Sequence, residues 1–487
     1  MFILRMLLEI AIMIILCVIA GFVVVKIIFK KKGKKKLSIK KVKTVVFDVS
    51  KVKEDVAIPA IKGKDDLAYY EVLQGLNDIA EDKNIKKVII DVDELSLTFS
   101  QLEEISKIFD KIRKNKEVVA IGTLFDENRY KQALLADKIY MLDTRQSTLV
   151  FRGYLHKEMY LKSFLEKFGI RMNVLHIGNY KVAGEKYNHN EMSEEKKESI
   201  KNIKDKVFED FVKLVKNKRG TDIEEEILNG NLIFAGKEKA MEYKLIDGVA
   251  DYDEIGINYK EDTVSLEDYI SMSKEKKEKA KDTIAVINLE GVIDGRNSKK
   301  SITYENVCDK LEILEKMKNL KGLVLRINSP GGSALVSEKI YKKLKKVTVP
   351  IYVSMGDLCA SGGYYIATTG KKLFANSITL TGSIGVVMMY PEVVETLKKL
   401  DVNLEGFEKG SGFDMLNPFE KLGEDSKEKI IYNMNEVYAE FKEHVMKARG
   451  MNEEELEKIA QGRVWLGSEA RNINLIDEIG SLEECIK

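Results

Sequence analysis

Short apolar runs alternate with amphipathic segments along the chain from residue 44 onward. Residues 322–328 and 350–356 are almost continuous apolar stretches rich in β-branched residues, which is typical of buried strands. A turn and then a segment with helical spacing of its apolar positions follow each stretch, and the turn after the second stretch is predicted at 357–360. This alternation predicts an α/β fold with mainly parallel strand pairing.

The globular part of the chain contains two copies of this plan. Three pairs of segments align at nearly equal offsets of about 232 to 235 residues, which is hard to produce by chance. The pairs are 84–97 with 319–332, Gly122 with Gly356, and Gly230 with Gly462. We therefore predict two tandem repeats, at 44–259 and 283–487, joined by a charged linker at 260–282 that is partly helical.

The first 43 residues have a different pattern. An apolar segment at 10–29 is interrupted only by Lys26 and has about the 20 residues needed to cross a bilayer. No small-residue cleavage site follows it, so the sequence predicts an uncleaved membrane anchor. Nine lysines then fall between residues 30 and 43. Lysine clusters beside an anchor bind anionic headgroups, so residues 1–43 are predicted to be an anchor with a polybasic flank.

The overall composition is that of a folded globular body, with 44% hydrophobic and 32% charged residues. The formal net charge is only +2, so the basic character is local, and the lack of aromatic residues among the lysines argues against nucleic-acid binding. The four cysteines have neither paired nor metal-type spacing, so we expect no disulfide framework and no metal or organic cofactor. They are Cys17, Cys308, Cys359 and Cys485.

A candidate nucleophile, Ser361, begins the helical segment after residues 357–360, and two glycines follow it. A hydroxyl there lies next to unpaired backbone N–H groups and a helix dipole that favour negative charge. The turn at 329–332, Ser-Pro-Gly-Gly, can also present N–H groups to an anion. The commoner role of such a serine is a helix N-cap. Cys359 is a rival nucleophile, although a small buried thiol is the commoner role for that residue.

A nucleophilic serine needs a base, and the chain has only four histidines. They are His156, His176, His189 and His444. Only His189 is a plausible triad member, because His444 lies on an amphipathic helix where we expect it to be exposed. A buried lysine is the other way to activate a serine, since desolvation lowers its pKa toward neutrality.

The two turn-and-helix units resemble the Clp protease/crotonase superfold. Through the fuller match at 355–367 and Leu-Thr-Gly-Ser-Ile-Gly-Val at 380–386, the chain resembles the signal peptide peptidase A family in its long, protease IV form, over about residues 44–487. This resemblance implies two tandem Clp protease/crotonase-like repeats preceded by a transmembrane helix. The first repeat departs from the catalytic pattern, because Glu127 stands at the position of Ser361 and residues 95–97 replace Pro-Gly-Gly.

In the long members of that family the base is a lysine of the N-terminal repeat, in a Gly-x-Tyr-Lys context that Gly178 to Lys181 match. The second repeat has Phe413 at the corresponding place, so one repeat would hold the nucleophile and the other the base. The acidic and polar segment after Lys181 departs from the usual family pattern. The resemblance thus implies Ser361 as the nucleophile and Lys181 as the general base and acid.

Three further residues receive roles from the same resemblance. The N–H groups of Gly362 and Gly332 would form an oxyanion hole, which stabilises the negative charge of the tetrahedral intermediate. Ser383, in the 380–386 motif, matches a serine that orients the lysine, and its alternative role is that of a turn residue.

The resemblance implies a membrane-anchored serine endopeptidase with a Ser-Lys dyad that degrades cleaved signal peptides and other apolar peptides. It also implies a homotetramer and a single-pass protein of the cytoplasmic membrane with its catalytic body outside the cytoplasm. The lysine block after the anchor predicts the opposite sidedness, because such blocks tend to stay cytoplasmic. Two other functions remain open at this point, a crotonase-like acyl-CoA enzyme and a non-catalytic membrane scaffold.

Overall fold

The computed structural model describes six stretches of the chain. They are residues 39–49, 52–53, 67–257, 262–273, 281–295 and 301–487. The predicted membrane span at 10–29 and the polybasic residues up to 38 lie outside these stretches. Among the residues described, none of the helices combines the length and the apolar character that a membrane crossing needs.

The first repeat is built on a six-stranded parallel sheet with the strand order β11-β7-β5-β4-β1-β12. The central strands are buried along their whole apolar stretch, as parallel strands covered on both faces must be. In chain order, the strands are β1 (Thr44–Phe47), β4 (Lys87–Asp91), β5 (Glu117–Gly122), β7 (Lys138–Leu142), β11 (Gly248–Ala250) and β12 (Thr263–Ser265).

Helices and two small sheets complete this repeat. The longest helix, α7, runs from Glu194 to Arg219, with Ser193 as its N-cap and Gly220 ending it in the left-handed conformation. The other helices are α2 (Tyr69–Glu81), α3 (Phe99–Ile112), α4 (Glu127–Ala133), α5 (Lys162–Lys167), α6 (Glu185–Asn188), α8 (Glu224–Leu228), α9 (Lys237–Glu242), α10 (Tyr252–Ile255) and α11 (Leu266–Ser273), with a 3₁₀ turn at Ile39–Lys41. The small sheets comprise β6 (Leu124–Asp126), β8 (Thr148–Val150) and β10 (Ile233–Ala235), and the pair β2 (Val52–Lys53) and β3 (Leu67–Ala68).

Part of the segment predicted as a linker belongs to the first sheet. Strand β12 pairs in parallel with β1, and the side chains of Tyr269 and Ile270 on α11 are buried. Apolar residues at these positions dock the segment, although charged residues surround them in the sequence.

The second repeat repeats the plan with a seven-stranded sheet in which β13-β14-β15-β16-β20 are parallel neighbours. The strands are β13 (Thr283–Glu290), β14 (Leu320–Ser329), β15 (Ile351–Ala360), β16 (Lys372–Ala375), β17 (Leu380–Gly382), β19 (Val464–Leu466) and β20 (Glu478–Ile479). The helices are α12 (Tyr304–Glu315), α13 (Ala334–Leu344), α14 (Gly362–Ala367), α15 (Val394–Lys399), α16 (Glu424–Arg449), α17 (Glu453–Glu457), α18 (Gly467–Asn472) and α19 (Leu482–Ile486).

The turn predicted at 357–360 is wrong, because β15 continues to Ala360. Its last three residues pair in parallel with β17, so the backbone there has a strand partner. Strand β17 is only three residues long, so its own sequence gives little signal of this partner. The longer β15 brings the strand end directly to Ser361.

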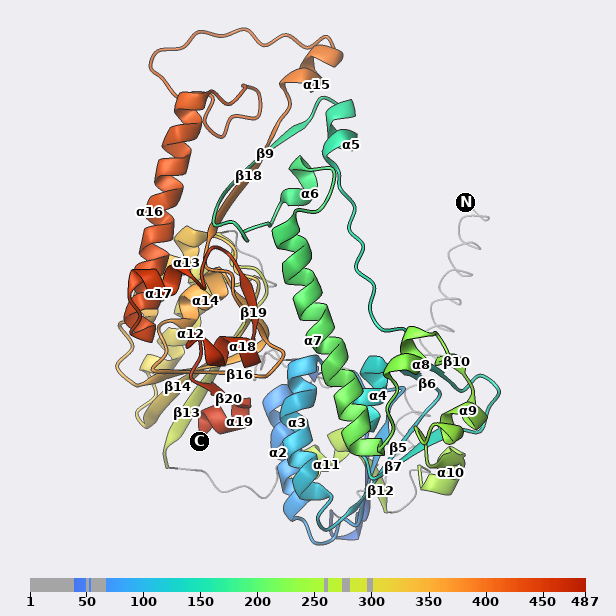
Figure 1. Cartoon of the computed structure of the whole chain (residues 1–487). Coiled ribbons are helices and arrows are strands. Elements are labelled where there is room, and N and C mark those ends of the chain that lie inside the picture. Colours follow the sequence, from blue (N-terminus) through green and yellow to red (C-terminus); the bar gives the residue numbers. More distant parts are fainter. Residues whose placement is uncertain (1–38, 50–51, 54–66, 258–261, 274–280, 296–300) are drawn as a thin grey trace, which may run out of the picture.

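The two repeats are joined by pairing and by a continuous core. Strand β9 (Arg171–Ile177) of the first repeat pairs antiparallel with β18 (Val386–Glu392) of the second. Figure 1 shows α2 and α3 of the first repeat between the two sheets, and α7 running from the end where β9 and β18 meet toward the first sheet. A fully buried ion pair, Arg326 to Glu104 at 2.7 Å, also joins the repeats. A site made from both repeats is therefore held on a shared framework.

Candidate active site

Ser361 stands at the sharp junction between β15 and α14. Its backbone has φ 54° and ψ −123°, a conformation that a residue with a side chain adopts at a cost of about 1–3 kcal/mol. Its N–H donates to the carbonyl oxygen of Gly382 at 2.9 Å, which fixes the turn. Strained strand-to-helix turns of this kind are used to expose a nucleophilic hydroxyl above the end of a sheet.

The Pro-Gly-Gly turn lies directly against this junction. Gly331 and Gly332 have φ values of 90° and 152°, and a Cβ on Gly331 would stand 2.5 Å from the amide nitrogen of Gly362. Ile293 and Gly332 form a parallel bridge, in which the Ile293 N–H donates to the Gly331 carbonyl oxygen and the Ser333 N–H donates to the Ile293 carbonyl oxygen. The N–H of Gly332 is not used in this bridge and points away from Ile293. A Cβ on Gly362 would lie 3.3 Å from the Gly332 nitrogen. The two predicted oxyanion donors are therefore neighbours beside Ser361.

Lys181 of the first repeat reaches Ser361 of the second. Its Nζ lies 2.9 Å from Ser361 Oγ, 2.9 Å from Ser383 Oγ and 2.7 Å from the Ser383 carbonyl oxygen. The sequence predicted that these three residues meet, and the structure brings them together. A neutral amine here can donate two N–H bonds to Ser383 and accept the Ser361 hydroxyl proton with its lone pair.

Burial sets the protonation of this lysine. The Lys181 side chain is 5% exposed, and in the described part of the chain no carboxylate lies within ion-pair distance of its Nζ. Desolvation penalises the charged form and lowers the pKa of Lys181 to about 7. A lysine in this range is half neutral near pH 7 and can take up a proton at that pH.

Two strands hold the lysine and its serine partner in register. Strand β9 ends four residues before Lys181 and β18 begins three residues after Ser383, and Ile177 faces Val386 where the two strands start to pair. Ser383 has φ 55°, and its N–H donates to the Arg463 carbonyl oxygen at 2.7 Å. The backbone on both sides of the contact is thus tied down.

Residues that the sequence analysis missed hold the backbone of Lys181 in place. Gly462 packs so closely on it that a Cβ at that position would stand 2.5 Å from the Lys181 nitrogen. The carbonyl and side-chain oxygens of Gln461 accept hydrogen bonds from the N–H groups of Tyr180 at 2.8 Å and Asn179 at 3.1 Å. The sequence alignment of the two repeats includes Gly462, paired with Gly230, but it served only as evidence of the duplication and not as a sign of a site residue.

Arg463 joins the same two loops through its side chain. Its guanidinium donates to Glu198 at 2.8 Å and lies 4.8 Å from the centre of the Tyr180 ring. Glu198 also accepts from the Tyr180 hydroxyl at 2.9 Å. This network connects helix α7 to the loop before Lys181.

The rival nucleophile and triad base are placed differently. The Cys359 side chain is fully buried, and burial raises the pKa of its thiol, so it is a packing residue. His189 is exposed just after α6. It lines a cavity of about 200 Å³ together with Lys181, but among the described residues no hydrogen bond joins its ring to Ser361. Phe413, at the second repeat's lysine position, is 44% exposed in the loop before α16.

The prediction that His444 is exposed is wrong. Its side chain is 15% exposed on the inner face of α16, where its Nε2 lies 3.1 Å from Glu338 and its ring lies 3.9 Å from that of Tyr341. Tyr365 on α14 donates a hydrogen bond to the same carboxylate at 2.6 Å. His444 therefore belongs to a polar contact between α16 and α13, which the charged residues around it in the sequence concealed.

Comparison with known proteins places these features in a family. The model of peptidase family S49 matches residues 110–267 and 343–487, one range in each repeat, and the Clp protease model matches 275–382. Protease 4 of Haemophilus influenzae is 27% identical over 86% of this chain and 72% of its own. The chloroplastic serine protease SPPA of Arabidopsis thaliana is 29% identical over 84% of this chain and 63% of its own.

Two further matches cover shorter parts. A putative signal peptide peptidase SppA of Enterococcus faecium is 34% identical over 39% of this chain and 56% of its own. Among solved structures, a mutant of ClpP1 from Listeria monocytogenes is 17% identical, covers 42% of this chain and 94% of its own, and has a TM-score of 0.29. The model of peptidase family S49 alone matches more than half of the chain. This match favours the serine endopeptidase over the acyl-CoA enzyme and the non-catalytic scaffold. The chain belongs to peptidase family S49 and is a serine endopeptidase.

Proposed function

We propose that this serine endopeptidase works with a Ser361–Lys181 dyad divided between its two repeats. The observation that carries the proposal is the 2.9 Å distance between Lys181 Nζ and Ser361 Oγ, made by a buried lysine without a carboxylate partner among the described residues. A serine hydroxyl is a weak nucleophile until an adjacent base takes its proton. Neutral Lys181 is that base.

The reaction follows from these distances. As Ser361 Oγ attacks the peptide carbonyl carbon, its proton passes to Lys181 Nζ, and the carbonyl oxygen becomes an oxyanion that accepts from the N–H groups of Gly362 and Gly332. The Lys181 ammonium then donates its proton to the leaving amine as the C–N bond breaks. Water, deprotonated by Lys181, hydrolyses the acyl-enzyme and returns the proton through the lysine to Ser361.

Ser383 is a positioning residue in this scheme. Its hydroxyl and carbonyl oxygens both lie within hydrogen-bond distance of Lys181 Nζ. These two acceptors direct the amine's own hydrogens away from Ser361, so its lone pair faces the hydroxyl that must lose its proton.

The substrates we propose are apolar peptides, including cleaved signal peptides, acted on by an enzyme anchored to the cytoplasmic membrane with its body on the extracytoplasmic side. Support comes from the apolar 10–29 segment and from the similarity to the Enterococcus faecium protein named as a signal peptide peptidase. The sidedness is tested by adding a protease to intact spheroplasts and to inverted vesicles. Digestion of the body only in inverted vesicles would overturn it.

We also propose that the enzyme assembles as a homotetramer through the end of the molecule that carries α5 and α15 (Figure 1). Many large apolar side chains are exposed in or just after α5 and in the chain that follows α15, and exposed apolar surface is used for protein–protein contacts. They are Phe164, Phe168, Leu400, Val402, Leu404, Phe407, Met415, Leu416 and Phe419. Light scattering of the solubilised protein should give four copies, and Phe407→Asp should reduce that number. A monomeric wild type would refute the assembly.

A fluorophosphonate probe tests the catalytic proposal. It forms a covalent bond with an activated serine, and the labelled residue is identified by mass spectrometry. The proposal expects one modified residue, Ser361, in folded protein and none after denaturation. Labelling at another serine, or no labelling of folded protein that still cleaves a peptide, would refute the assignment of Ser361.

A further inference from the structure

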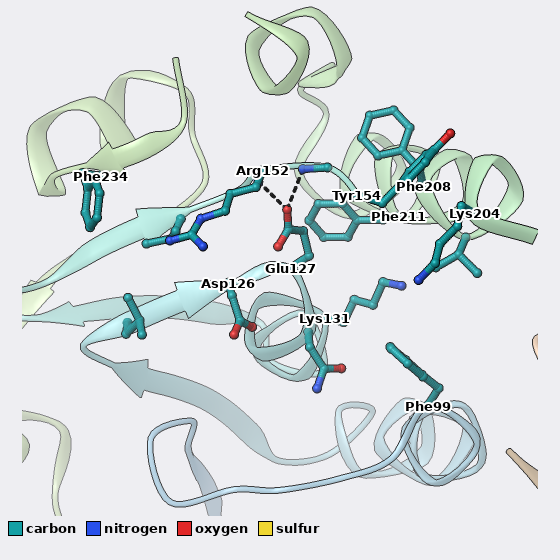
Figure 2. Close-up of a pocket in the computed structure, with 15 residues that line it drawn as sticks. Phe99, Asp126, Glu127, Lys131, Arg152, Tyr154, Lys204, Phe208, Phe211 and Phe234 are labelled. Carbon is teal, nitrogen blue, oxygen red and sulfur yellow. Dashed lines mark hydrogen bonds between the residues drawn. The ribbon is translucent and has the colours of Figure 1, made fainter. Parts of the chain in front are cut away.

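The first repeat has a cavity beside the position that corresponds to the nucleophile. Glu127, which aligns with Ser361, is the first residue of α4, whereas Ser361 directly precedes α14. Next to Glu127 opens a cavity of about 580 Å³, a size typical of pockets that enclose a small ligand. Most of its wall is apolar (Figure 2). The apolar residues are Phe99, Leu124, Val150, Val207, Phe208, Phe211 and Phe234.

Three cationic side chains that line this cavity form no ion pair with a carboxylate among the described residues. They are Lys131, Arg152 and Lys204. Across the described ranges, no carboxylate lies within ion-pair distance of any of the three. Neighbouring lysines on α7 behave differently, because Lys201 pairs with Asp205 and Lys206 pairs with Glu469. Lys204 therefore differs from these two neighbours on α7, because its cation faces the cavity without a carboxylate at ion-pair distance.

The two carboxylates that line the cavity, Asp126 and Glu127, accept hydrogen bonds from backbone N–H groups. Asp126 caps α4 by accepting from the N–H of Arg129 at 2.8 Å. Glu127 accepts from the backbone N–H groups of Arg152 at 2.5 Å and Gly153 at 2.9 Å, as the dashed lines in Figure 2 show. Both carboxylates keep their charge, but the three lining cations outnumber them, so the net charge that the cavity offers to a ligand is positive.

Lys131 lies between two of the aromatic rings that line the cavity. Its ammonium lies 5.5 Å from the centre of the Phe99 ring and 5.6 Å from that of Phe211. Desolvation lowers the pKa of Lys131 from its usual value, and the more distant carboxylates of Asp210 and Glu127 offset only part of this effect. Figure 2 shows the amines of Lys131 and Lys204 directed toward the same part of the cavity. The cavity thus offers cations for an anion and aromatic rings for apolar groups.

We propose that this cavity binds the C-terminal end of an apolar peptide. The terminal carboxylate pairs with Lys131 and Lys204, and the last side chains pack among the phenylalanines. An endopeptidase generates such ends, because every cleavage leaves a new C-terminal carboxylate on one product. The repeat that lost the nucleophile is then a second peptide-binding site of the same enzyme, separate from Ser361.

Isothermal titration calorimetry on the full chain in nonionic detergent tests this proposal. The protein carries Ser361→Ala so that nothing is cleaved, and the probes are acetyl-Ala-Leu-Ala-Leu-Phe as the free acid and as the C-terminal amide. We expect the free acid to bind at least about tenfold more tightly than the amide, since the amide loses the charge-assisted pairs. Equal affinities for the acid and the amide would overturn the proposal.

Variants assign the binding to the cavity. Lys131→Gln should remove the preference for the free acid, Lys131→Arg should retain it, and Lys213→Met, an exposed lysine on α7 away from the cavity, should leave it unchanged. A free-acid preference that survives Lys131→Gln would place the peptide elsewhere and overturn the assignment. Lauric acid is the final probe. Binding of laurate that depends on Lys131, with neither peptide bound, would make the cavity a fatty-acid site and refute the peptide.

Discussion

Gly462 of the second repeat lies against the backbone of Lys181 of the first, so closely that a Cβ on Gly462 would stand 2.5 Å from the Lys181 nitrogen. The base of the proposed dyad is therefore positioned by the repeat that also carries the nucleophile. Because of this contact, a substitution at Gly462 should reduce activity although Gly462 has no side chain that takes part in catalysis.

Gly462→Ala should reduce kcat by about a hundredfold or more, because a shift of about 1 Å in a reacting group can cost that much. The added methyl group must displace the Lys181 backbone, and with it Nζ from Ser361 Oγ. Steady-state kinetics on a fluorogenic apolar peptide measure the effect.

Gly450→Ala is the matched control for backbone strain. Gly450 has φ 66°, close to the 78° of Gly462, but a Cβ there would meet no atom within 4 Å. Both variants should lose similar stability, and only Gly462→Ala should lose activity. Equal losses of kcat in the two variants would show that the close contact with Lys181 is unimportant.

The pH dependence of kcat/KM should follow the proton on Lys181. Its pKa is lowered to about 7, and only the neutral amine accepts the Ser361 proton. We expect log kcat/KM to rise by one per pH unit below about pH 7 and to level off above it. A profile flat from pH 5 to pH 8 would contradict a lysine base.

The same pKa links Lys181 to stability with a defined sign. Between the folded pKa of about 7 and the unfolded value of 10.5, the unfolded chain binds more protons, so the wild type gains stability as the pH rises. Below pH 7 both states are protonated and the penalty is constant. Lys181→Met removes this dependence, so its stability relative to wild type should fall by about 2 kcal/mol between pH 7 and pH 9. Urea unfolding at the two pH values measures the difference, and a constant difference would contradict the lowered pKa.

Ser383→Ala tests the positioning role of that hydroxyl. The variant loses one acceptor of the Lys181 amine and keeps the other, the carbonyl oxygen, so we expect kcat to fall about tenfold with little change in KM. Because an acceptor favours the charged lysine, the apparent pKa of kcat/KM should move to lower pH. A lower kcat with an unmoved pH profile would indicate a purely structural role.

The sequence predicted the parts of the site that depend on local pattern and on duplication. Ser361 was a candidate from a strand, a turn and two glycines, and the family resemblance together with the repeat offset pointed to Lys181. Gln461 and Gly462 were missed as site residues because they act through backbone contacts with a segment about 280 residues away, which no local pattern encodes.

Errors in the predicted fold have the same origin. Residues 358–360 are strand because of the distant β17, part of the predicted linker joins the first sheet through β12, and His444 is covered by a neighbouring helix. In each case a tertiary partner decided the outcome, and the local sequence could not reveal that partner.

The most direct test of the divided dyad compares kcat/KM of Lys181→Met with that of Ser361→Ala and His189→Ala on one fluorogenic apolar peptide. Circular dichroism and light scattering confirm that each variant is folded and assembled. We predict that Lys181→Met and Ser361→Ala both lose at least about a thousandfold, and that His189→Ala keeps most of the activity. Near-normal turnover by Lys181→Met, with Ser361→Ala inactive, would contradict the account and leave a serine peptidase with a different base.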